Sequence, residues 1–437
     1  MDGDDLVMFL CPDLSGLSRG RAFPAADLAE RLKTGVGWVP ADQALTPFDE
    51  IAEPNPWGPI GDLRLMPDPA TEVRVELWEE ASPLHFFVCD CTHTDGSPWD
   101  ACARTFLKGA LADLEAEGFH LRAAFEHEFH VAGLEAKPGP GFSFEALRAV
   151  EPLGPLVMAA LREAGAEPEM FLPEYGNAQY EVVCRPARGL AAADRAVIIR
   201  EVVREAARGL GLRASFSPLV DPAGVGNGVH IHMSLEDREG RPLSYDGARP
   251  GGLSELAAGF AAGILRHLPA LVALTAPSVI SYLRLVPHNW SAAFTCLGLR
   301  NREAALRIAP VLEMAGADPA RQYNLEYRPA DAAASPHLAL GAVVRAGLAG
   351  IREGLEPPPI IEQDPVELSD DERRRLGVVR LPETLAAALE ALEADAVVRS
   401  WFSDDLWNCY LSLKRTEMGI LEGLEAEAMC ARYLEVY

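Results

Sequence analysis

The hydrophobic pattern of the chain changes near residue 98. Before that point, short apolar runs alternate with turn-rich stretches, which predicts a small sheet with few helices. These runs cover residues 6–10, 73–77 and 86–88. After that point, long segments carry apolar residues at helical spacing. We therefore expect an α+β protein with a small β-rich domain over residues 1–97 and a larger domain over residues 98–437.

The larger domain alternates predicted helices with predicted strands. Amphipathic patterns predict helices over residues 100–117, 191–210, 253–268 and 338–351. Alternating polarity predicts strands over residues 121–132, 180–183, 228–235, 304–308 and 324–327. Three further helices are expected at 385–392, 405–413 and 420–434. The residues with candidate chemistry fall on the strands.

Composition narrows the class of protein. The 437 residues are 49% hydrophobic and 24% charged, which is typical of a globular chain with two or three domains. A net charge of -26 argues against a nucleic-acid surface, which needs a basic stripe. The sequence has no apolar run of about 18 residues, and its N-terminus does not resemble a secretory signal. We therefore expect a cytoplasmic protein without a membrane partner.

The eight cysteines are dispersed through mostly apolar surroundings. Cys89 and Cys91 form the only close pair, and no second pair matches them. We therefore expect buried free thiols.

Paired carboxylates supply the first candidate chemistry. Glu126 and Glu128 lie two residues apart in a predicted strand, so their side chains point to the same face. Two neighbouring carboxylates repel each other, and a divalent cation would neutralise them if that face is covered. The alternative is a solvated strand face, and this motif alone leaves both interpretations open.

Two histidines repeat the same spacing. His230 and His232 follow a glycine-rich stretch, residues 224–228, that would let backbone and ligand approach closely. A histidine pair on a strand is as often a hydrogen-bonded structural pair as a set of ligands.

More acids and several arginines complete the set. The acids are Glu174, Glu181 and Glu326, and the arginines are Arg284, Arg300, Arg302 and Arg307. Several hard oxygen ligands with one or two imidazoles suit Mg²⁺ or Mn²⁺ and disfavour a thiolate zinc site. Arginine suits bidentate recognition of phosphate and carboxylate. The combination predicts a metal site that serves phosphates.

The order of these motifs resembles the glutamine synthetase family over nearly the whole chain. The segments that carry the resemblance are residues 13–20, 61–68, 126–128, 174–181, 226–234, 281–287, 300–307 and 326–328. The resemblance implies a β-grasp-like N-terminal domain and a catalytic domain with a curved antiparallel sheet and flanking helices. It also implies a homo-oligomer of stacked rings, such as a dodecamer.

The resemblance implies a role for each motif. Metal ligands are expected in two groups, Glu128, Glu174 and Glu181 for one cation, and Glu126, His230 and Glu326 for the cation that bridges the ATP phosphates. Other contacts are expected from Gly226, Arg284 and Arg328 to the acid substrate, from Arg302 and Arg307 to the transferred phosphate, and from His232 and Ser234 to the nucleotide. A side-chain carboxylate would attack the γ-phosphate of ATP, and an amine would then displace phosphate from the acyl phosphate.

One position departs from the family pattern. In ammonia-using members, the loop after Arg-Leu-Val-Pro carries a glutamate that takes a proton from ammonium, and here that position is Trp290. Tryptophan cannot accept the proton. An aspartate latch of the first domain is also missing from residues 35–60.

These departures predict a ligase that joins glutamate to an organic amine. Trp290 would favour an apolar or aromatic amine by burial and stacking, and His288 is a candidate base for an alkyl amine. Three alternatives remain. Trp290 packs in a loop away from substrate, or the chain is an ordinary ammonia-dependent glutamine synthetase, or it is a catalytically silent member.

Overall fold

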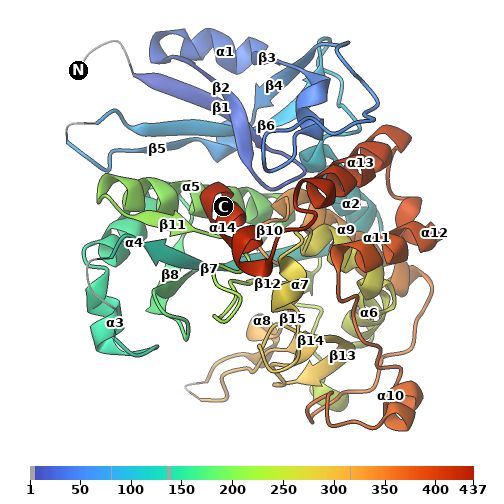
Figure 1. The fold of residues 1–437 in the computed structure, drawn as a ribbon. Coiled ribbons are helices and arrows are strands. Elements are labelled where there is room, and N and C mark those ends of the chain that lie inside the picture. Colours follow the sequence, from blue (N-terminus) through green and yellow to red (C-terminus); the bar gives the residue numbers. More distant parts are fainter. Residues whose placement is uncertain (1–4, 80, 135–138, 315) are drawn as a thin grey trace.

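The N-terminal sheet forms the upper layer of the molecule in Figure 1. The computed structural model describes residues 5–79, 81–134, 139–314 and 316–437. The sheet has the order β2-β1-β6-β4-β3, with β5 paired to β6. Its strands are β1 (Leu6–Pro12), β2 (Ser18–Pro24), β3 (Val36–Trp38), β4 (Leu63–Pro67), β5 (Val73–Val75) and β6 (Leu84–His93).

The predicted apolar runs of this part fall in β1, β5 and β6. The sequence did not predict β2, an edge strand with three polar residues in its first four positions. Phe23 is the only buried residue of this strand. The sequence also gave no sign of helix α1 (Leu28–Thr34), which has no fully buried residue. β2 lacks the periodic apolar positions on which a prediction would depend, and α1 offers only Leu28 and Leu32, which are too few to identify so short a helix.

A second sheet lies below the first and has the order β13-β14-β15-β12-β7-β9-β8. Two short strands, β10 and β11, also pair with β7. The pairs are antiparallel except for β13 with β14, which is parallel. The strands are β7 (His120–Ala132), β8 (Pro168–Pro173), β9 (Gln179–Cys184), β10 (Ala187–Arg188), β11 (Arg213–Ser215), β12 (Val229–Glu236), β13 (Phe294–Leu299), β14 (Ala304–Ile308) and β15 (Leu325–Tyr327).

Helices cover one side of this sheet. Along β7, every second side chain is buried, and these residues face the core beside α5. The opposite face of the strand is free to carry polar groups. The helices are α2 (Ala103–Ala116), α3 (Phe144–Ala149), α4 (Leu153–Glu163), α5 (Gly189–Gly209), α6 (Glu255–Thr275), α7 (Ser281–Arg284), α8 (Pro319–Gln322), α9 (Pro336–Arg352), α10 (Asp370–Leu376), α11 (Leu385–Ala394), α12 (Ala396–Arg399), α13 (Asp404–Ile420) and α14 (Ala426–Val436).

Helix α6 is long and apolar enough to cross a membrane by length and composition, but 83% of its apolar window is buried inside the protein. It packs closely on α9, where a Cβ on Gly263 would lie 2.1 Å from the carbonyl oxygen of Ala346. Glycine therefore permits the close contact of the two helices. The apolar surface of α6 is explained by its place in the core.

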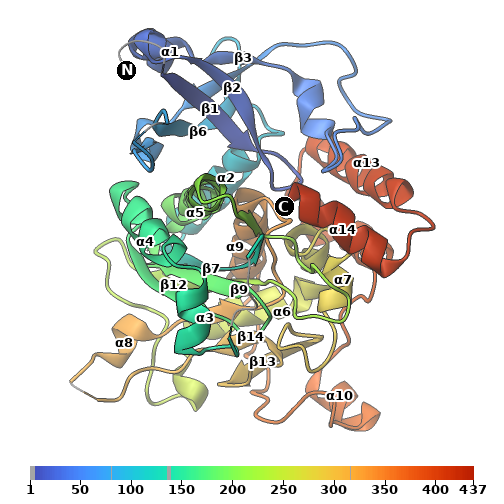
Figure 2. The same cartoon turned by 60° about the vertical axis from the view of Figure 1, so that its left-hand side comes forward.

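A buried arginine joins the two domains. Arg104 of α2 pairs with Asp90 and Asp68 of the first domain at 2.9 and 2.6 Å, and with Asp194 of α5 at 2.9 Å. The C-terminal helices α13 and α14 also lie beside the first domain, as Figure 2 shows. The hydroxyl of Tyr437 donates to the carbonyl of Ser15 at 2.7 Å. All eight cysteines are buried free thiols, as predicted.

Candidate active site

The strand register brings the predicted carboxylates to one face of the second sheet. Glu128 on β7 lies opposite Glu181 on β9, and Glu126 lies opposite His230 on β12. Because directly opposed residues of an antiparallel pair share a face, all four side chains project to the same side.

The same face continues across the next two strands. His232 lies opposite Glu326 on β15, and Glu326 lies opposite Arg307 on β14. Five neighbouring strands therefore each contribute at least one predicted site residue to a single surface.

Both histidines face Glu126. The Nε2 atom of His232 lies 3.0 Å from a carboxylate oxygen of Glu126, and Nδ1 of His230 lies 3.5 Å from the other oxygen. Burial alone would raise the pKa of Glu126, but its ion pairs with His232 and His230 outweigh burial and hold that pKa well below its usual value. Burial would lower the pKa of His232, yet the charge of Glu126 raises it to about 9.

The geometry offers a metal position at this point. Glu126, His232 and Glu326 each place one ligand atom within 4.8 Å of the others. Asn324 fixes the other ring nitrogen of His232 at 2.7 Å, while Nε2 is buried without a hydrogen bond of good geometry among the described residues. A divalent cation would satisfy this atom. His230, the histidine expected as a ligand, also lies 3.7 Å from Glu326.

The second group of acids is crowded and weakly neutralised. Burial raises the pKa of Glu128 to about 7 and, with the charges of the neighbouring carboxylates, raises that of Glu181 to about 9. Burial also raises the pKa of Glu174, which lies in the turn between β8 and β9. A cation would relieve this repulsion, and the oxygen-rich set fits Mg²⁺ or Mn²⁺.

Two arginines lie beside Glu326. Arg307 pairs with Glu326 at 2.5 Å, and Arg328 pairs with the second oxygen of the same carboxylate. Burial would raise the pKa of Glu326, but Arg328 and the other nearby cations lower it to about 2. Glu326 is therefore ionised at neutral pH.

Two glycines allow Arg284, the arginine expected to contact the acid substrate, to approach the acids. A Cβ on Gly226 would lie 2.5 Å from Cγ of Arg284, and one on Gly228 would lie 3.3 Å from Nη1 of the same residue. The backbone N–H of Gly228 donates to Glu128 at 2.6 Å. Arg284 is buried and donates to the carbonyl of Ala330 at 3.0 Å.

The remaining predicted residues border this face. Ser234 lies two residues beyond His232 on β12, with its side chain on the same side. Arg302 is exposed in the turn between β13 and β14, and its carbonyl accepts a hydrogen bond from Arg328 at 3.0 Å. Arg300 lies apart from the site, because its side chain pairs with the exposed Glu313 at 3.3 Å.

The loop that carries Trp290 is held in a strained conformation. His288, Trp290 and Ala292 have φ values of 67°, 51° and 74°, which are unfavourable for residues with side chains. Glu303 accepts the backbone N–H groups of His288 and Trp290 at 3.1 and 3.2 Å, and Arg328 donates to the carbonyl of Trp290. The His288 ring pairs with Asp364 at 3.0 Å.

Sequence reasoning missed Glu303 and Asn324. Glu303 holds the Trp290 loop from 13 residues away, and Asn324 orients His232 from 92 residues away. Glu303 lies within the segment 300–307 and Asn324 at the start of a predicted strand, but nothing local shows which groups they contact, so only the folded structure identifies their roles.

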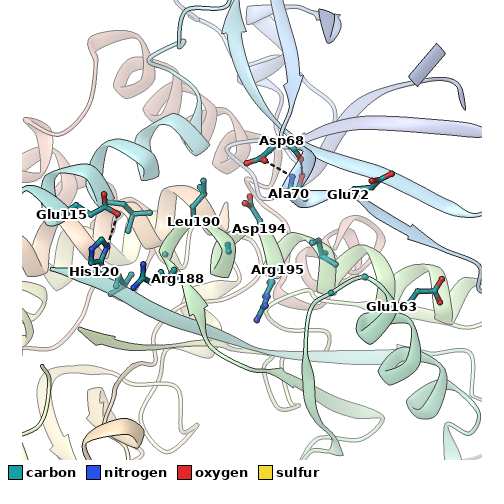
Figure 3. Close-up of a pocket in the computed structure, with 18 residues that line it drawn as sticks. Asp68, Ala70, Glu72, Glu115, His120, Glu163, Arg188, Leu190, Asp194 and Arg195 are labelled. Atoms are coloured by element: carbon teal, nitrogen blue, oxygen red, sulfur yellow. Dashed lines mark hydrogen bonds and ion pairs between the residues drawn. The ribbon is translucent and has the colours of Figure 1, made fainter. Parts of the chain in front are cut away.

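A separate cavity of about 630 Å³ lies at the junction of the two domains (Figure 3). Its lining includes Asp68, His120 and Arg195. Several charged groups there are paired within the protein, as in His120 with Glu115 at 3.2 Å and Arg195 with Glu167 at 2.5 Å. This cavity does not overlap the carboxylate face, which is the surface that carries Glu126, Glu128, Glu181 and Glu326.

Comparisons with known proteins find similarity along nearly the whole chain. Residues 2–99 match the family model for the glutamine synthetase N-terminal domain, and residues 100–433 match that for the glutamine synthetase catalytic domain. A γ-glutamylpolyamine synthetase of Streptomyces coelicolor is 37% identical, with 98% of this chain and 92% of that protein covered. A glutamine synthetase of Pyrococcus furiosus is 33% identical, with 97% and 92% covered.

Solved structures extend the similarity to the fold. A structure described as a novel glutamine synthase homolog is 49% identical, covers 99% of both chains and has a TM-score of 0.93. A GmaS/ADP complex is 26% identical, covers 99% of this chain and 97% of that chain, and has a TM-score of 0.82.

Proposed function

The chain belongs to the glutamine synthetase family, and from this premise we propose that it is an ATP-dependent ligase that joins glutamate to an organic amine as a γ-glutamyl amide. The observation that carries the proposal is the shared face of five strands, where acids, histidines and arginines converge. Such a site can hold divalent cations and phosphates together.

The metal ligands are proposed in two groups, which are Glu128, Glu174 and Glu181 for one cation, and Glu126, His230, His232 and Glu326 as the candidates for the other. Bound Mg²⁺ or Mn²⁺ would neutralise charge on the phosphates of ATP. The crowding of acids with raised pKa values supports the first group. The second group is supported by the short distances around Glu126.

Cationic side chains bring the two anionic substrates together. Arg284 and Arg328 would hold the carboxylate groups of glutamate beside Gly226, because a guanidinium binds a carboxylate in a bidentate manner. Arg302 and Arg307 would stabilise the transferred phosphate, while His232 and Ser234 border the nucleotide. Attack by the glutamate side chain on the γ-phosphate yields γ-glutamyl phosphate and ADP. The amine then displaces phosphate and forms the amide.

The identity of residue 290 supports an organic amine in place of ammonia. By the resemblance of residues 284–307 to the family, Trp290 takes the position of the glutamate that deprotonates ammonium in ammonia-using members. Its indole cannot act as that base. His288, the candidate base for an alkyl amine, pairs with Asp364. The name of one similar protein, a γ-glutamylpolyamine synthetase, agrees with a substrate other than ammonia.

The wider biological setting follows from family membership. We propose a division into domains at residues 97 and 98, a cytoplasmic location, and a homo-oligomer of stacked rings. Active sites would then lie between subunits, and the mass of the assembly in solution tests this part of the proposal.

A phosphate-release assay tests the reaction. Purified protein with Mg²⁺ or Mn²⁺, ATP and glutamate is offered ammonium, alkyl amines, polyamines, ethanolamine or anilines, and the amide product is identified by mass. We expect at least one organic amine to exceed ammonium clearly. The reverse ranking would identify an ordinary ammonia-dependent glutamine synthetase, and no turnover with any amine would identify a silent member.

A further inference from the structure

Two exposed aromatic side chains meet beside the carboxylate face. The rings of Tyr175 and Trp290 lie 6.2 Å apart between centroids, with an angle of 41° between their planes. Tyr175 is 66% exposed and Trp290 is 53% exposed. Large aromatic rings exposed to solvent beside a polar site indicate a ligand-binding surface.

The turn that carries Tyr175 is firmly held. Gly176 donates its N–H to the side chain of Gln179 at 2.9 Å, and the amide of Gln179 donates to the carbonyl of Gly226 at 2.9 Å. The backbone N–H of Tyr175 donates to the carboxylate of Glu174 at 3.1 Å. The position of Tyr175 is therefore tied to a proposed metal ligand and to the proposed glutamate site.

The loop that carries Trp290 is held from the other side. Its positive φ of 51° is maintained by Glu303 and by the donation from Arg328 to its carbonyl. Strain of this kind persists where the surrounding structure fixes it, and it is frequent at functional sites. Arg328 also pairs with Glu326, so the backbone of Trp290 borders the site directly.

The chemistry of the pair indicates the class of amine. Each oxygen of the Glu303 carboxylate already accepts a backbone N–H, and Glu174 is a proposed metal ligand. The wall made by the two rings is therefore mainly apolar. An apolar or aromatic body gains from burial against both rings, whereas a distal ammonium would gain only an exposed cation–π contact.

We propose that Tyr175 and Trp290 together form an aromatic wall that binds the carbon body of the incoming amine, and that Tyr175 is a specificity-determining residue for a primary amine with an apolar or aromatic body. The inference rests on the proposed function. It adds Tyr175 to the same site and narrows the organic amine to the apolar or aromatic class expected from Trp290.

The test compares Tyr175→Ala and Tyr175→Phe with the unaltered protein. Steady-state phosphate release is measured with benzylamine, isopropylamine, putrescine and methylamine. We expect Tyr175→Ala to raise the KM for benzylamine roughly tenfold, with a smaller effect on methylamine, because the smaller body has less surface to bury. Tyr175→Phe retains the ring and should preserve the KM for benzylamine. The KM values for ATP and glutamate should stay within about twofold, since the proposal assigns the wall to the amine and to neither of these substrates.

A matched control removes an exposed ring elsewhere. Phe144 of α3 is 75% exposed, and Phe144→Ala should leave every KM unchanged. A combined Tyr175→Ala and Trp290→Ala variant should raise the KM for benzylamine by less than the product of the single effects, because the two rings act on one ligand.

Each of the other outcomes would overturn either the inference about Tyr175 or the proposed function. If the unaltered protein uses organic amines but Tyr175→Ala leaves the KM for benzylamine unchanged, the inference is wrong and the proposed function stands. A larger effect on putrescine than on benzylamine would replace the apolar class with a cationic one. An altered assembly mass with equal loss for all substrates would assign the rings to a subunit contact. If the unaltered protein uses no organic amine, the proposed function fails and the inference fails with it.

Discussion

Glu181 on β9 lies directly opposite Glu128 on β7, so a buried and a partly buried carboxylate share one face at the centre of the site. Burial and the charges of neighbouring acids raise the pKa of Glu181 to about 9, and burial raises that of Glu128 to about 7. A bound cation would neutralise the carboxylates and relieve their repulsion.

Replacement of Glu181 by glutamine is expected to weaken metal binding without unfolding the protein. The variant keeps the shape of the side chain but removes a ligand charge, so the increase in Tm on addition of Mn²⁺ or Mg²⁺ should fall to less than half of its original size. Thermal unfolding with and without metal measures this. Glu169→Gln, on the exposed face of β8, is the control and should keep the full increase. An unchanged increase in Glu181→Gln would contradict the assignment of Glu181 as a ligand.

Replacement of Arg307 by alanine is expected to slow phosphoryl transfer. Its guanidinium lies beside Glu326 on the same face as the metal ligands, where negative charge develops. We expect the kcat of Arg307→Ala to fall about 100-fold, which is equivalent to about 2.7 kcal/mol of activation free energy. The kcat of Arg307→Lys should lie between those of Arg307→Ala and the unaltered protein. Arg321→Ala, on the exposed helix α8, should retain full activity. Initial-rate measurements decide, and equal activity of the two alanine variants would exclude Arg307 from catalysis.

Replacement of Trp290 by glutamate is expected to shift the enzyme toward ammonium. The new carboxylate can accept a proton from ammonium, so kcat/KM for ammonium should rise roughly tenfold while that for the best organic amine falls. Trp290→Gln is matched in size and lacks the base. If both variants respond alike, the effect comes from space and not from proton transfer.

Replacement of Gly226 by alanine is expected to damage glutamate binding selectively. The added Cβ would lie 2.5 Å from Cγ of Arg284 and 2.8 Å from the carbonyl oxygen of Pro218, so either the backbone or Arg284 must move. We expect the KM for glutamate to rise about tenfold with little change in the KM for ATP. Gly224→Ala, where the nearest contact is 3.2 Å away, is the milder control. Equal rises for glutamate and ATP would indicate a general disturbance of the site.

Acid is expected to weaken the junction of the two domains through Asp194. Burial would raise the pKa of this group, but hydrogen bonds from His337 and Arg104 lower it from 3.8 to about 2. A lowered pKa contributes stability that is complete above about pH 4 and is lost as the pH falls through 2. The contribution is about 2 kcal/mol.

Urea unfolding of Asp194→Asn tests this contribution. At pH 7 the variant should lose about 3 kcal/mol of unfolding free energy, because the buried Arg104 loses one of its three carboxylate partners and keeps only Asp68 and Asp90. The difference from the unaltered protein should narrow below pH 4. Asp113→Asn removes a more exposed ion pair with Arg345 and should cost less than about 1 kcal/mol. A difference that stays constant down to pH 2.5 would exclude Asp194 as the titrating group.

The sequence predicted individual strands well where one face is buried. The strand expected at 121–132 became β7, and the alternation that placed Glu126 and Glu128 together is visible in its burial. The alternation of buried and exposed residues along one strand, however, cannot predict the order of the strands in the sheet. The contacts between β7, β9 and β12 join segments separated by about 50 to 100 residues, and their register depends on packing of the whole sheet.

The sequence by itself determined the residue types, the side of each strand on which they lie and the family to which the chain belongs, because these follow from local spacing and motif order. Only the tertiary structure decided that His232 and His230 both face Glu126, that Glu303 holds the strained loop, and that Tyr175 meets Trp290. The physical reason is that these contacts are fixed by long-range packing and hydrogen bonds, which leave no periodic trace along the chain.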